Sequence, residues 1–557
     1  MMRLKERIKH LCLGVGAFSI LLSTQNTSAN ANMAFHDVTA TVMMNSLEPL
    51  PANNFLRKLY TQLFFVPVWV QEESLSSLSK ELFNQIRNDK TLLENSKLKK
   101  DANHLSLAAD SLYTSYGSLK EKVELEFKIA QLYKGYADYT LYGSINWGAF
   151  QGRLYNLRTK GIKGAWVTYK PEFSPTSLLE SAILNGSLEQ MFTKAIPKEY
   201  GYEALQNALF KYLEIEKKGG WEHLPLKGIM RAGKSYAVVP ALRERLRISG
   251  DYKTCARDEG TVYGKCLKEA VIHFQERHGL VAKGVIGKET IKVLNVPIEL
   301  RIKQIRLNLD RIKWLHQRDA KRHIMINIPA FTLFFEEDGK LRQQMRVITG
   351  KKKNPTPVFS NTVKTIVLNP HWNVPKSIIQ NEMIPKLMKN PNAMVKQGIE
   401  IRTGWSKDAK KIDGGSVDWS QYRYSKSMPF RFAQVPGYKN ALGKVKFLFP
   451  NEFAVYMHDT PNKNLFNRSK RAFSHGCIRL HKPRELLKTF STFNENVDFE
   501  KSQKRLKGKS KAYLSLQNQV PVDVVYLTAY VDYNGVLKFP NDVYGYDKMQ
   551  LQSYRQW

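Results

Sequence analysis

HIMINIPAFTLFF, at residues 323–335, is a run in which apolar and polar side chains alternate, and the pair Asp338-Gly339 follows it. Alternation with a period of two is typical of a strand with one buried face, and an Asp-Gly pair favours a tight turn. The stretch therefore predicts a β-hairpin. Further strand-like segments at 345–350, 362–368 and 453–457 extend the β content, so we expect a β-rich domain with loops over its sheet in this part of the chain.

Residues 33 to about 220 have a different pattern. They are rich in Leu, Ala, Glu and Lys, and their apolar positions recur at intervals of three and four, as at Leu178, Leu179 and Ile183. This spacing predicts helices, and Gly219-Gly220 marks a break after them. A chain of 557 residues suggests two to four domains. We therefore expect a multidomain α+β protein with a helical scaffold domain over residues 32–225.

The N-terminus has the pattern of a secretory signal. Basic residues between Arg3 and Lys9 precede an apolar run from Leu11 to Leu22, and Ala29-Asn30-Ala31 is a small-x-small cleavage site. We expect residues 1–31 to be removed on export, with an uncleaved anchor as the alternative. The formal net charge of +36 predicts a polyanionic partner: nucleic acid, an anionic membrane or an acidic wall polymer. Export makes nucleic acid the least favoured partner.

Four cysteines bear on the chemistry. Cys12 falls in the signal, which leaves Cys255, Cys266 and Cys477 in an oxidising compartment. Cys255 and Cys266 can close a small loop, leaving Cys477 as a free thiol, although the sequence also allows the first two to stay reduced. The chain has no CxxC pair and no HExxH, so we predict no metal site.

The free thiol lies in the run Ser474-His475-Gly476-Cys477-Ile478-Arg479, nineteen residues after His458. A thiol needs a nearby base or cation to react at neutral pH, and either histidine or Arg479 can supply one. Gly476 permits a turn that directs backbone N–H groups at an oxyanion. The run therefore predicts an acyl-transfer site, and its alternative is an inert buried cysteine beside two surface histidines.

A second group of motifs lies between residues 235 and 297: Leu242-Arg243-x-x-Leu246, Gly250-Asp251, Ala270-Val271-x-x-Phe274-Gln275-x-x-His278-Gly279-Leu280 and Gly284-x-Ile286-Gly287-x-x-Thr290-x-x-x-Leu294-Asn295. This region resembles the type 1 peptidoglycan-binding domain, a small three-helix module. Lys283 stands where that family usually has Asp, which bears on ligand binding at this turn. A helical packing module without glycan affinity is the alternative.

A longer series of motifs follows in order: Asn327-Ile328-Pro329-Ala330, Val347-Ile348-x-Gly350, Thr356-Pro357-Val358-Phe359-Ser360, Asn369-Pro370-x-Trp372-Asn373-Val374-Pro375, Ala441-Leu442-Gly443, Met457-His458-Asp459-Thr460-Pro461 and the Cys477 run. From about residue 320 to 495 the chain resembles the YkuD-type L,D-transpeptidase catalytic domain. The order of domains is similar to that of large periplasmic Gram-negative members. The resemblance implies a linker helix at 298–319 and a catalytic domain at 320–557, with an insert at 380–440 and a C-terminal hairpin at 520–547.

The resemblance implies a mechanism. The Cys477 thiolate attacks the meso-diaminopimelate carbonyl of a donor tetrapeptide stem and releases D-Ala, and the acyl group then passes to an acceptor amine to give a 3-3 cross-link. His458 is the base and then the acid. Backbone N–H groups of Gly476 and Cys477, with the Tyr456 hydroxyl, form the oxyanion hole. No cofactor is implied, and a carbapenem is expected to acylate the thiol.

Roles around this core follow from the same resemblance. Arg479 suits a substrate carboxylate, and His475 and Ser474 shape the site or bind substrate. Trp372, Asn373 and Trp405 are expected to line the donor groove. The aromatic residues of the insert are expected to form a lid surface that closes on substrate.

Three functions remain open on sequence alone: the transpeptidase, an L,D-carboxypeptidase or endopeptidase that uses the same acyl-enzyme, and a noncatalytic peptidoglycan-binding protein. The expected partners are stem peptides and glycan strands of peptidoglycan. The acceptor can be a stem amine, a free D-amino acid or a lysine of an outer-membrane lipoprotein, and peptidoglycan synthases are candidate partners.

Overall fold

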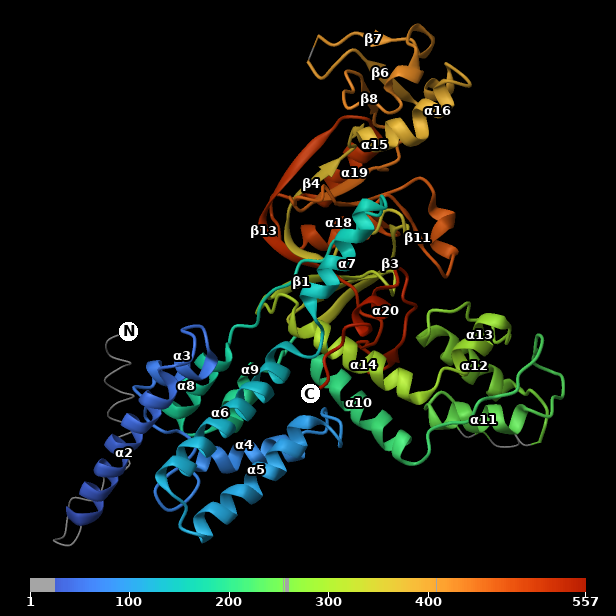
Figure 1. Cartoon of the computed structure of the whole chain (residues 1–557). Coiled ribbons are helices and arrows are strands. Elements are labelled where there is room, and N and C mark those ends of the chain that lie inside the picture. Colours follow the sequence, from blue (N-terminus) through green and yellow to red (C-terminus); the bar gives the residue numbers. More distant parts are fainter. Residues whose placement is uncertain (1–25, 254, 256–259, 407) are drawn as a thin grey trace.

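The computed structural model describes residues 26–253, 255, 260–406 and 408–557 (Figure 1). Most of the expected signal, residues 1–31, lies outside these residues, and the expected cleavage point after Ala31 falls within helix α2 (Asn26–Leu47). Across these ranges, no helix combines the length and the apolar character needed to cross a bilayer.

The N-terminal part is helical, as its apolar spacing predicts. Its helices are α2, α3 (Phe55–Gln62), α4 (Ser77–Asn88), α5 (Lys97–Thr114), α6 (Leu119–Tyr142), α7 (Trp147–Thr159), α8 (Pro175–Asn185), α9 (Leu188–Ala195) and α10 (Tyr202–Lys217). Side-chain caps fix where several of them begin; at α6, Ser118 and Glu121 form a reciprocal capping box. The 24-residue α6 is the longest described helix, and it packs against α2, α3, α4, α5 and α8.

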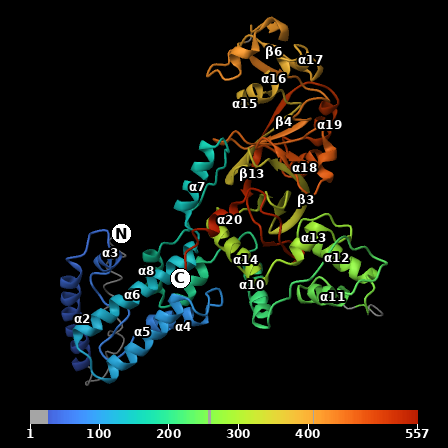
Figure 2. The same cartoon turned by 45° about the vertical axis from the view of Figure 1, so that its right-hand side comes forward.

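One segment of this region leaves the helical domain. Trp147 and Phe150 of α7, with Trp166 beyond it, pack in the same hydrophobic core as the catalytic sheet. The Val167 N–H donates to the Val358 carbonyl at 2.8 Å, which holds the segment against the sheet. Both views show α7 reaching up to that sheet (Figures 1 and 2). Within the expected scaffold region of 32–225, this segment therefore packs against the sheet and not in the core of the other helices.

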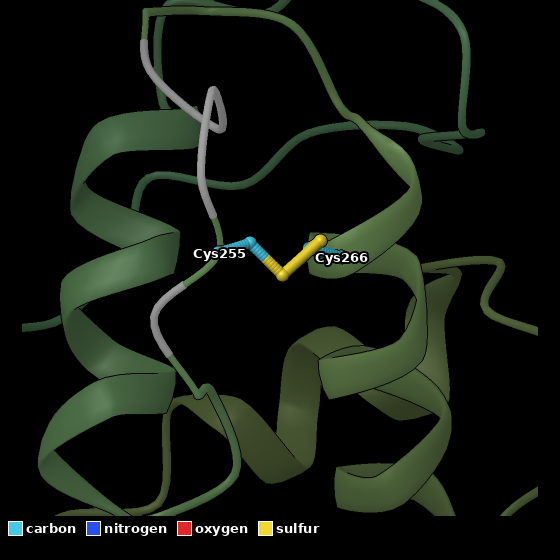
Figure 3. The surroundings of a disulfide bond; sticks show 2 residues. All are labelled: Cys255 and Cys266. Atoms are coloured by element: carbon cyan, nitrogen blue, oxygen red, sulfur yellow. A yellow bond between two sulfur atoms is a disulfide. The ribbon is translucent and has the colours of Figure 1, made fainter.

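The next unit is a three-helix module, as expected. It consists of α11 (Val239–Ile248), α12 (Lys265–Arg277) and α13 (Lys288–Leu294) around their own core. Cys255 and Cys266 are joined by a disulfide beside α12 (Figure 3). The Gln275 side chain accepts hydrogen bonds from the backbone N–H groups of Lys283 and Gly284, while the Lys283 side chain is exposed. Helix α14 (Ile298–Lys313) then leads to the catalytic domain.

A nine-stranded sheet forms the body of the catalytic domain, in the order β11-β3-β12-β10-β9-β4-β13-β1-β2, and a further β2–β3 pairing closes it on itself. Its strands are β1 (Arg322–Asn327), β2 (Thr332–Glu337), β3 (Lys340–Gly350), β4 (Phe359–Leu368), β9 (Val445–Leu448), β10 (Met457–His458), β11 (Ala472–Ser474), β12 (Ile478–Leu480) and β13 (Ala512–Val525). Helices α18 (Pro483–Ser491) and α19 (Phe499–Lys507) pack with it, and the short helix η4 (Lys463–Asn467) lies near β3.

The Asp338-Gly339 pair makes the turn between β2 and β3. Both residues have positive φ, 50° and 70°, as a two-residue hairpin turn requires. The alternating run at 323–335 is not a single strand, however. It contains β1, a turn at residues 328–331 and β2, and these two strands also pair antiparallel.

The insert, expected at 380–440, is a small unit with its own core that runs from β5 to β8, over residues 372–434. Strands β5 (Trp372–Asn373), β6 (Ile399–Arg402), β7 (Lys411–Ile412) and β8 (Arg431–Gln434) form a second sheet. The helical segments are α15 (Lys376–Ile378), the π-helical turn η1 (Ile379–Met383), α16 (Ile384–Leu387), α17 (Ala393–Lys396), η2 (Gly414–Ser416) and η3 (Trp419–Tyr422). Both views place this unit at the end of the catalytic domain farthest from the N-terminal helices.

The aromatic residues of this insert do not form the substrate-facing surface that the sequence led us to expect. Trp419 and Phe432 are 3% and 1% exposed, and Trp419 packs against both Phe430 and Phe432 inside the insert. Trp405 and Tyr424, at 64% and 83%, are exposed. Most of these rings are therefore the insert's own core, which gives a 60-residue segment a stable fold.

The C-terminal region also differs from a single hairpin at 520–547. Residues 520–525 belong to β13, which crosses the main sheet, and the hairpin is β14 (Tyr530–Val531) with β15 (Leu537–Lys538). Helix α20 (Tyr546–Leu551) follows. The chain ends against the N-terminal helices, where the Lys97 N–H donates to the Trp557 carbonyl at 2.8 Å.

Candidate active site

The catalytic candidates lie where two parallel strands begin. Strands β10 and β12 pair in parallel, with Met457 opposite Ile478 and His458 opposite Arg479. Tyr456 and Cys477 each precede their strand by one residue, and the Ile478 N–H donates to the Tyr456 carbonyl at 3.0 Å. This register brings Tyr456, His458, Cys477 and Arg479 to one place.

Gly476 determines the path of the chain into Cys477. Its φ is +117°, which residues with a side chain rarely adopt. Its carbonyl accepts a hydrogen bond from the Thr356 hydroxyl at 2.8 Å, and Thr356 in turn binds the Tyr544 hydroxyl through its backbone N–H. The backbone ahead of the thiol is thus held from behind by residues on two distant segments.

Ser474 acts inside this loop. It is 2% exposed, its hydroxyl donates to the Cys477 carbonyl at 2.5 Å, and its oxygen accepts the Gly476 N–H at 3.1 Å. Of the two roles expected for Ser474, the observed contacts agree with shaping of the site, because the side chain is buried and engaged within the loop. The Gly476 N–H is engaged by this contact as well, so in this arrangement it does not serve as an oxyanion donor.

The surroundings of Cys477 both suppress and promote its ionisation. Burial raises the pKa of the thiol, while hydrogen bonds from Tyr456 and the charges of Lys446 and Arg479 act in the opposite direction. The net effect is a raised pKa. The site therefore holds a neutral thiol beside groups that favour its anion.

His458 is set up as a neutral base. It is 4% exposed, and burial together with the charge of Arg479 lowers its pKa to about 3. Its Nδ1 lies 2.5 Å from the carbonyl oxygen of Asp459. A carbonyl only accepts, so Nδ1 carries the proton and Nε2 is left free to take one. The Asp459 carboxylate is turned elsewhere, toward the N–H groups of Lys444 and Thr460.

Arg479 carries an unused donor. Its Nε is buried and has no partner among the residues that the structure describes. Burial lowers the pKa of the guanidinium, and the nearby Cys477 opposes this effect. A buried N–H without a partner is costly, and a substrate carboxylate or carbonyl would satisfy it.

His475 connects the loop of residues 474–477, which we call the catalytic loop, to the insert. Its Nε2 lies 2.6 Å from the Glu382 carboxylate and 3.2 Å from the Lys351 amine. Glu382 lies on η1, a π-helical turn of the kind that is frequent at functional sites. The side chains of His475, Glu382 and Lys351 are 31%, 41% and 40% exposed, so their mutual attraction adds little stability.

The three candidates for the donor groove belong to the insert. Trp372 is half-buried against the insert's core, whereas Asn373 is exposed and accepts hydrogen bonds from Arg431 at 2.8 and 3.2 Å. The same guanidinium lies 5.3 Å from the ring centre of Trp405. Arg431 therefore links Asn373 to Trp405, while Trp372 mainly supports the fold.

The sequence did not single out Lys446. It lies on β9 opposite His458, and its amine is 3.6 Å from the ring centre of Tyr456. Burial lowers the pKa of Lys446, and the neighbouring Cys477 opposes this effect. The alternation of Val445, Lys446 and Phe447 gave one usable signal, since a lysine between two buried positions must point to the opposite face.

Comparison with protein families agrees with this arrangement. Residues 321–497 match the YkuD family, described as the L,D-transpeptidase catalytic domain. Residues 54–209 match a "Scaffold domain", and residues 235–294 match a "Putative peptidoglycan binding domain".

A curated protein of Haemophilus influenzae, described as "Putative L,D-transpeptidase", is 32% identical over 247 residues. That alignment covers 44% of this chain and 48% of the relative, so the chain spans about half the relative's length. Among solved structures, an L,D-transpeptidase from Stackebrandtia nassauensis has a TM-score of 0.22 at 17% identity, covering 53% of this chain and 94% of that one. One from Mycobacterium smegmatis has a TM-score of 0.17 at 15% identity, covering 37% and 59%.

The chain thus combines a helical region, a peptidoglycan-binding module and a β-rich catalytic domain that carries the free Cys477 next to β12. Residues 321–497 are a catalytic domain of the YkuD L,D-transpeptidase family, and the resemblance inferred from the motifs is confirmed for this domain and for the peptidoglycan-binding module.

Proposed function

We propose that the protein is a periplasmic peptidoglycan L,D-transpeptidase that forms 3-3 cross-links through an acyl-enzyme on Cys477. The observation that carries the proposal is the register of β10 and β12, which sets Tyr456 beside Cys477 and His458 beside Arg479. His458 has the tautomer that a general base needs, and the thiol is the only free one that the structure describes.

In the proposed reaction, the Cys477 sulfur attacks the meso-diaminopimelate carbonyl while Nε2 of His458 takes the thiol proton. The same proton then passes to the leaving D-Ala amine as the carbon–nitrogen bond breaks, which leaves a thioester. An acceptor amine attacks the thioester, loses its proton to His458 and releases the thiol. The imidazole of His458 therefore takes up and releases one proton in each half of the reaction.

The oxyanion that forms on the donor carbonyl is assigned to the Tyr456 hydroxyl and the Cys477 N–H. Each such donor is typically worth about 3 kcal/mol of barrier. Because the Gly476 N–H is held by Ser474, it can join them only if the loop shifts when substrate binds. Arg479 is assigned to a donor carboxylate, and Trp405 and Asn373 to the groove wall.

Incubation with purified tetrapeptide muropeptides tests the proposal. Mass analysis is expected to show cross-linked dimers and free D-Ala with the wild type, and neither product with Cys477→Ala. Tripeptides without dimers would show that water accepts the acyl group, and the protein would then be an L,D-carboxypeptidase and not a transferase. If Cys477→Ala still changes the muropeptides, the thiol is not the nucleophile. Supplying a free D-amino acid or a lipoprotein C-terminal lysine peptide as acceptor would identify the amine.

A further inference from the structure

Tyr544 lies behind the catalytic loop, although it comes from a part of the chain beyond residues 321–497, which match the family. Its side chain is buried, and its hydroxyl donates to the Gly350 carbonyl at 2.8 Å and accepts the Thr356 N–H at 3.1 Å. Gly350 is the last residue of β3, and Thr356 lies in the loop that leads on to β4. One phenol hydroxyl therefore bridges the two ends of this loop.

Thr356 carries this support to the residue before the thiol. Its side chain is fully buried, and its hydroxyl accepts the Gly350 N–H at 2.8 Å and donates to the Gly476 carbonyl at 2.8 Å. That carbonyl belongs to the peptide group whose N–H is the backbone N–H of Cys477. Because a peptide group is planar and trans, its C=O and its N–H point in opposite directions. A contact that fixes the carbonyl therefore fixes the direction of the Cys477 N–H.

The segment that carries Tyr544 is itself held by buried contacts. The Tyr544 N–H donates to the Tyr526 hydroxyl at 2.8 Å, and this hydroxyl donates to the Asp542 carboxylate at 2.6 Å. The same carboxylate accepts the first N–H groups of α20, and Asp547 of that helix pairs with Arg311 of α14 at 2.7 Å. The guanidinium of Arg311 is fully buried. The Tyr544 hydroxyl is therefore anchored to the body of the protein and does not depend on the catalytic loop for its position.

We propose that Tyr544 is a positioning residue that acts through Thr356 to aim the Cys477 N–H at the oxyanion. This rests on the proposed function, in which that N–H is one of the oxyanion donors. A donor stabilises a developing charge most when its direction is set before the reaction, because no reorganisation is then needed. The C-terminal segment, which lies outside the matched catalytic domain, would thus complete the catalytic site.

A comparison of two reactions of the same sulfur tests this role in the full mature chain. Acylation by a carbapenem passes through an oxyanion, whereas alkylation by iodoacetamide is a displacement without one. Tyr544→Phe is expected to slow acylation about 10- to 100-fold, because a donor that is slightly misaligned loses much of its effect. Alkylation should change less than about twofold, since it depends on the ionised fraction of the thiol. With tetrapeptide muropeptides, kcat should fall and KM should stay, because Tyr544 does not touch the substrate.

Tyr546→Phe is the matched control. Tyr546 is equally buried, its ring centre lies 5.4 Å from that of Tyr544, and its hydroxyl has no partner among the residues that the structure describes. Loss of this hydroxyl is expected to leave both rates unchanged.

Thr356 provides a second pair of variants, which keeps the test decisive if Tyr544→Phe does not fold. Thr356→Val removes the hydroxyl that holds Gly476 and keeps the shape of the side chain, so it should slow acylation at least as much as Tyr544→Phe. Thr356→Ser keeps the hydroxyl and should restore most of the rate. Thermal unfolding of each variant shows which of them are folded.

Four outcomes would overturn the positioning role. They are acylation at the wild-type rate in folded Tyr544→Phe or Thr356→Val, an equal loss in Tyr546→Phe, no recovery in Thr356→Ser, and a parallel fall in acylation and alkylation. The last would mean that the thiol itself had moved. A wild type that iodoacetamide alkylates, but that neither a carbapenem nor a muropeptide acylates, would overturn the proposed function and this role together.

Discussion

The resting state of the thiol and imidazole is the most direct prediction of the site. The pKa of Cys477 is raised and that of His458 is lowered to about 3, so both groups are expected to be neutral near pH 7. Many cysteine enzymes instead hold a preformed thiolate–imidazolium pair. Here the cations Arg479 and Lys446 oppose a second positive charge on His458. We therefore predict that Cys477 behaves as an un-ionised thiol until substrate binds.

The size of the effect follows from these pKa values. The pKa of His458 is lowered from 6.5 to about 3. At about 1.4 kcal/mol per pKa unit, protonation of His458 is about 5 kcal/mol less favourable than that of a free histidine. An ordinary thiol with a pKa of about 8.5 is about 3% ionised at pH 7, and Cys477 is expected to be below that level. Its alkylation rate should then rise about tenfold for each step of one in pH, or about 100-fold from pH 6 to pH 8.

Alkylation with iodoacetamide, followed by intact mass, measures this slope directly. The variant His458→Gln should keep the same slope, although its turnover of muropeptides should fall by about 10²- to 10⁴-fold as a general base is lost. Cys477→Ala controls for modification elsewhere. A rate that is flat between pH 6 and pH 8 in the wild type, and becomes steep in His458→Gln, would refute the neutral pair and establish an ion pair.

Three further predictions concern the loop, the insert and the sheet. Gly476→Ala should cost about 1–3 kcal/mol of stability, measured by thermal unfolding, because φ is +117°, and should slow carbapenem acylation at least tenfold. Glu382→Gln should change stability by less than about 1 kcal/mol but raise the KM for the donor stem. Glu485→Gln, at a glutamate that is also ion-paired and is 54% exposed against 41% for Glu382, should change neither. Burial lowers the pKa of His323, but its hydrogen bonds to Asp523 and Glu336 outweigh burial and raise the pKa to about 9. Protonated His323 therefore stabilises the fold fully below about pH 6.5, and this stabilisation is lost as the pH rises through 9. Accordingly, His323→Gln should cost up to about 3 kcal/mol at pH 6 and much less at pH 10, which urea unfolding at the two pH values can check.

The sequence predicted the catalytic domain well because its motifs are local. The turn at Asp338-Gly339 needs two positive φ values, and the residues present supply them. The three helices of the module follow from apolar spacing and glycine breaks. The turn at 328–331 was missed, since alternation continues on both sides of it and no glycine marks it.

Long-range burial could not be predicted in the same way. The apolar face of α7 has the pattern of any scaffold helix, yet it packs against the catalytic sheet. The aromatic residues of the insert looked available for substrate, but a small unit with few other large apolar groups must bury them. Lys446 and Glu382 carry no motif, and their importance comes only from the register of β9 with β10 and from the position of η1.

The charges around Cys477 explain how a neutral thiol can still react. If no ion pair exists at rest, the proton must leave the sulfur as the carbonyl carbon is attacked, and negative charge then develops on the carbonyl oxygen. Lys446 and Arg479 already act on the sulfur, because their charges lower the pKa of Cys477 against the effect of burial, so they favour the loss of its proton without a rearrangement. Glu382 approaches from the insert and holds His475, beside the same loop. The contact between His475 and Glu382 therefore ties the position of the insert to that of the loop that carries Cys477.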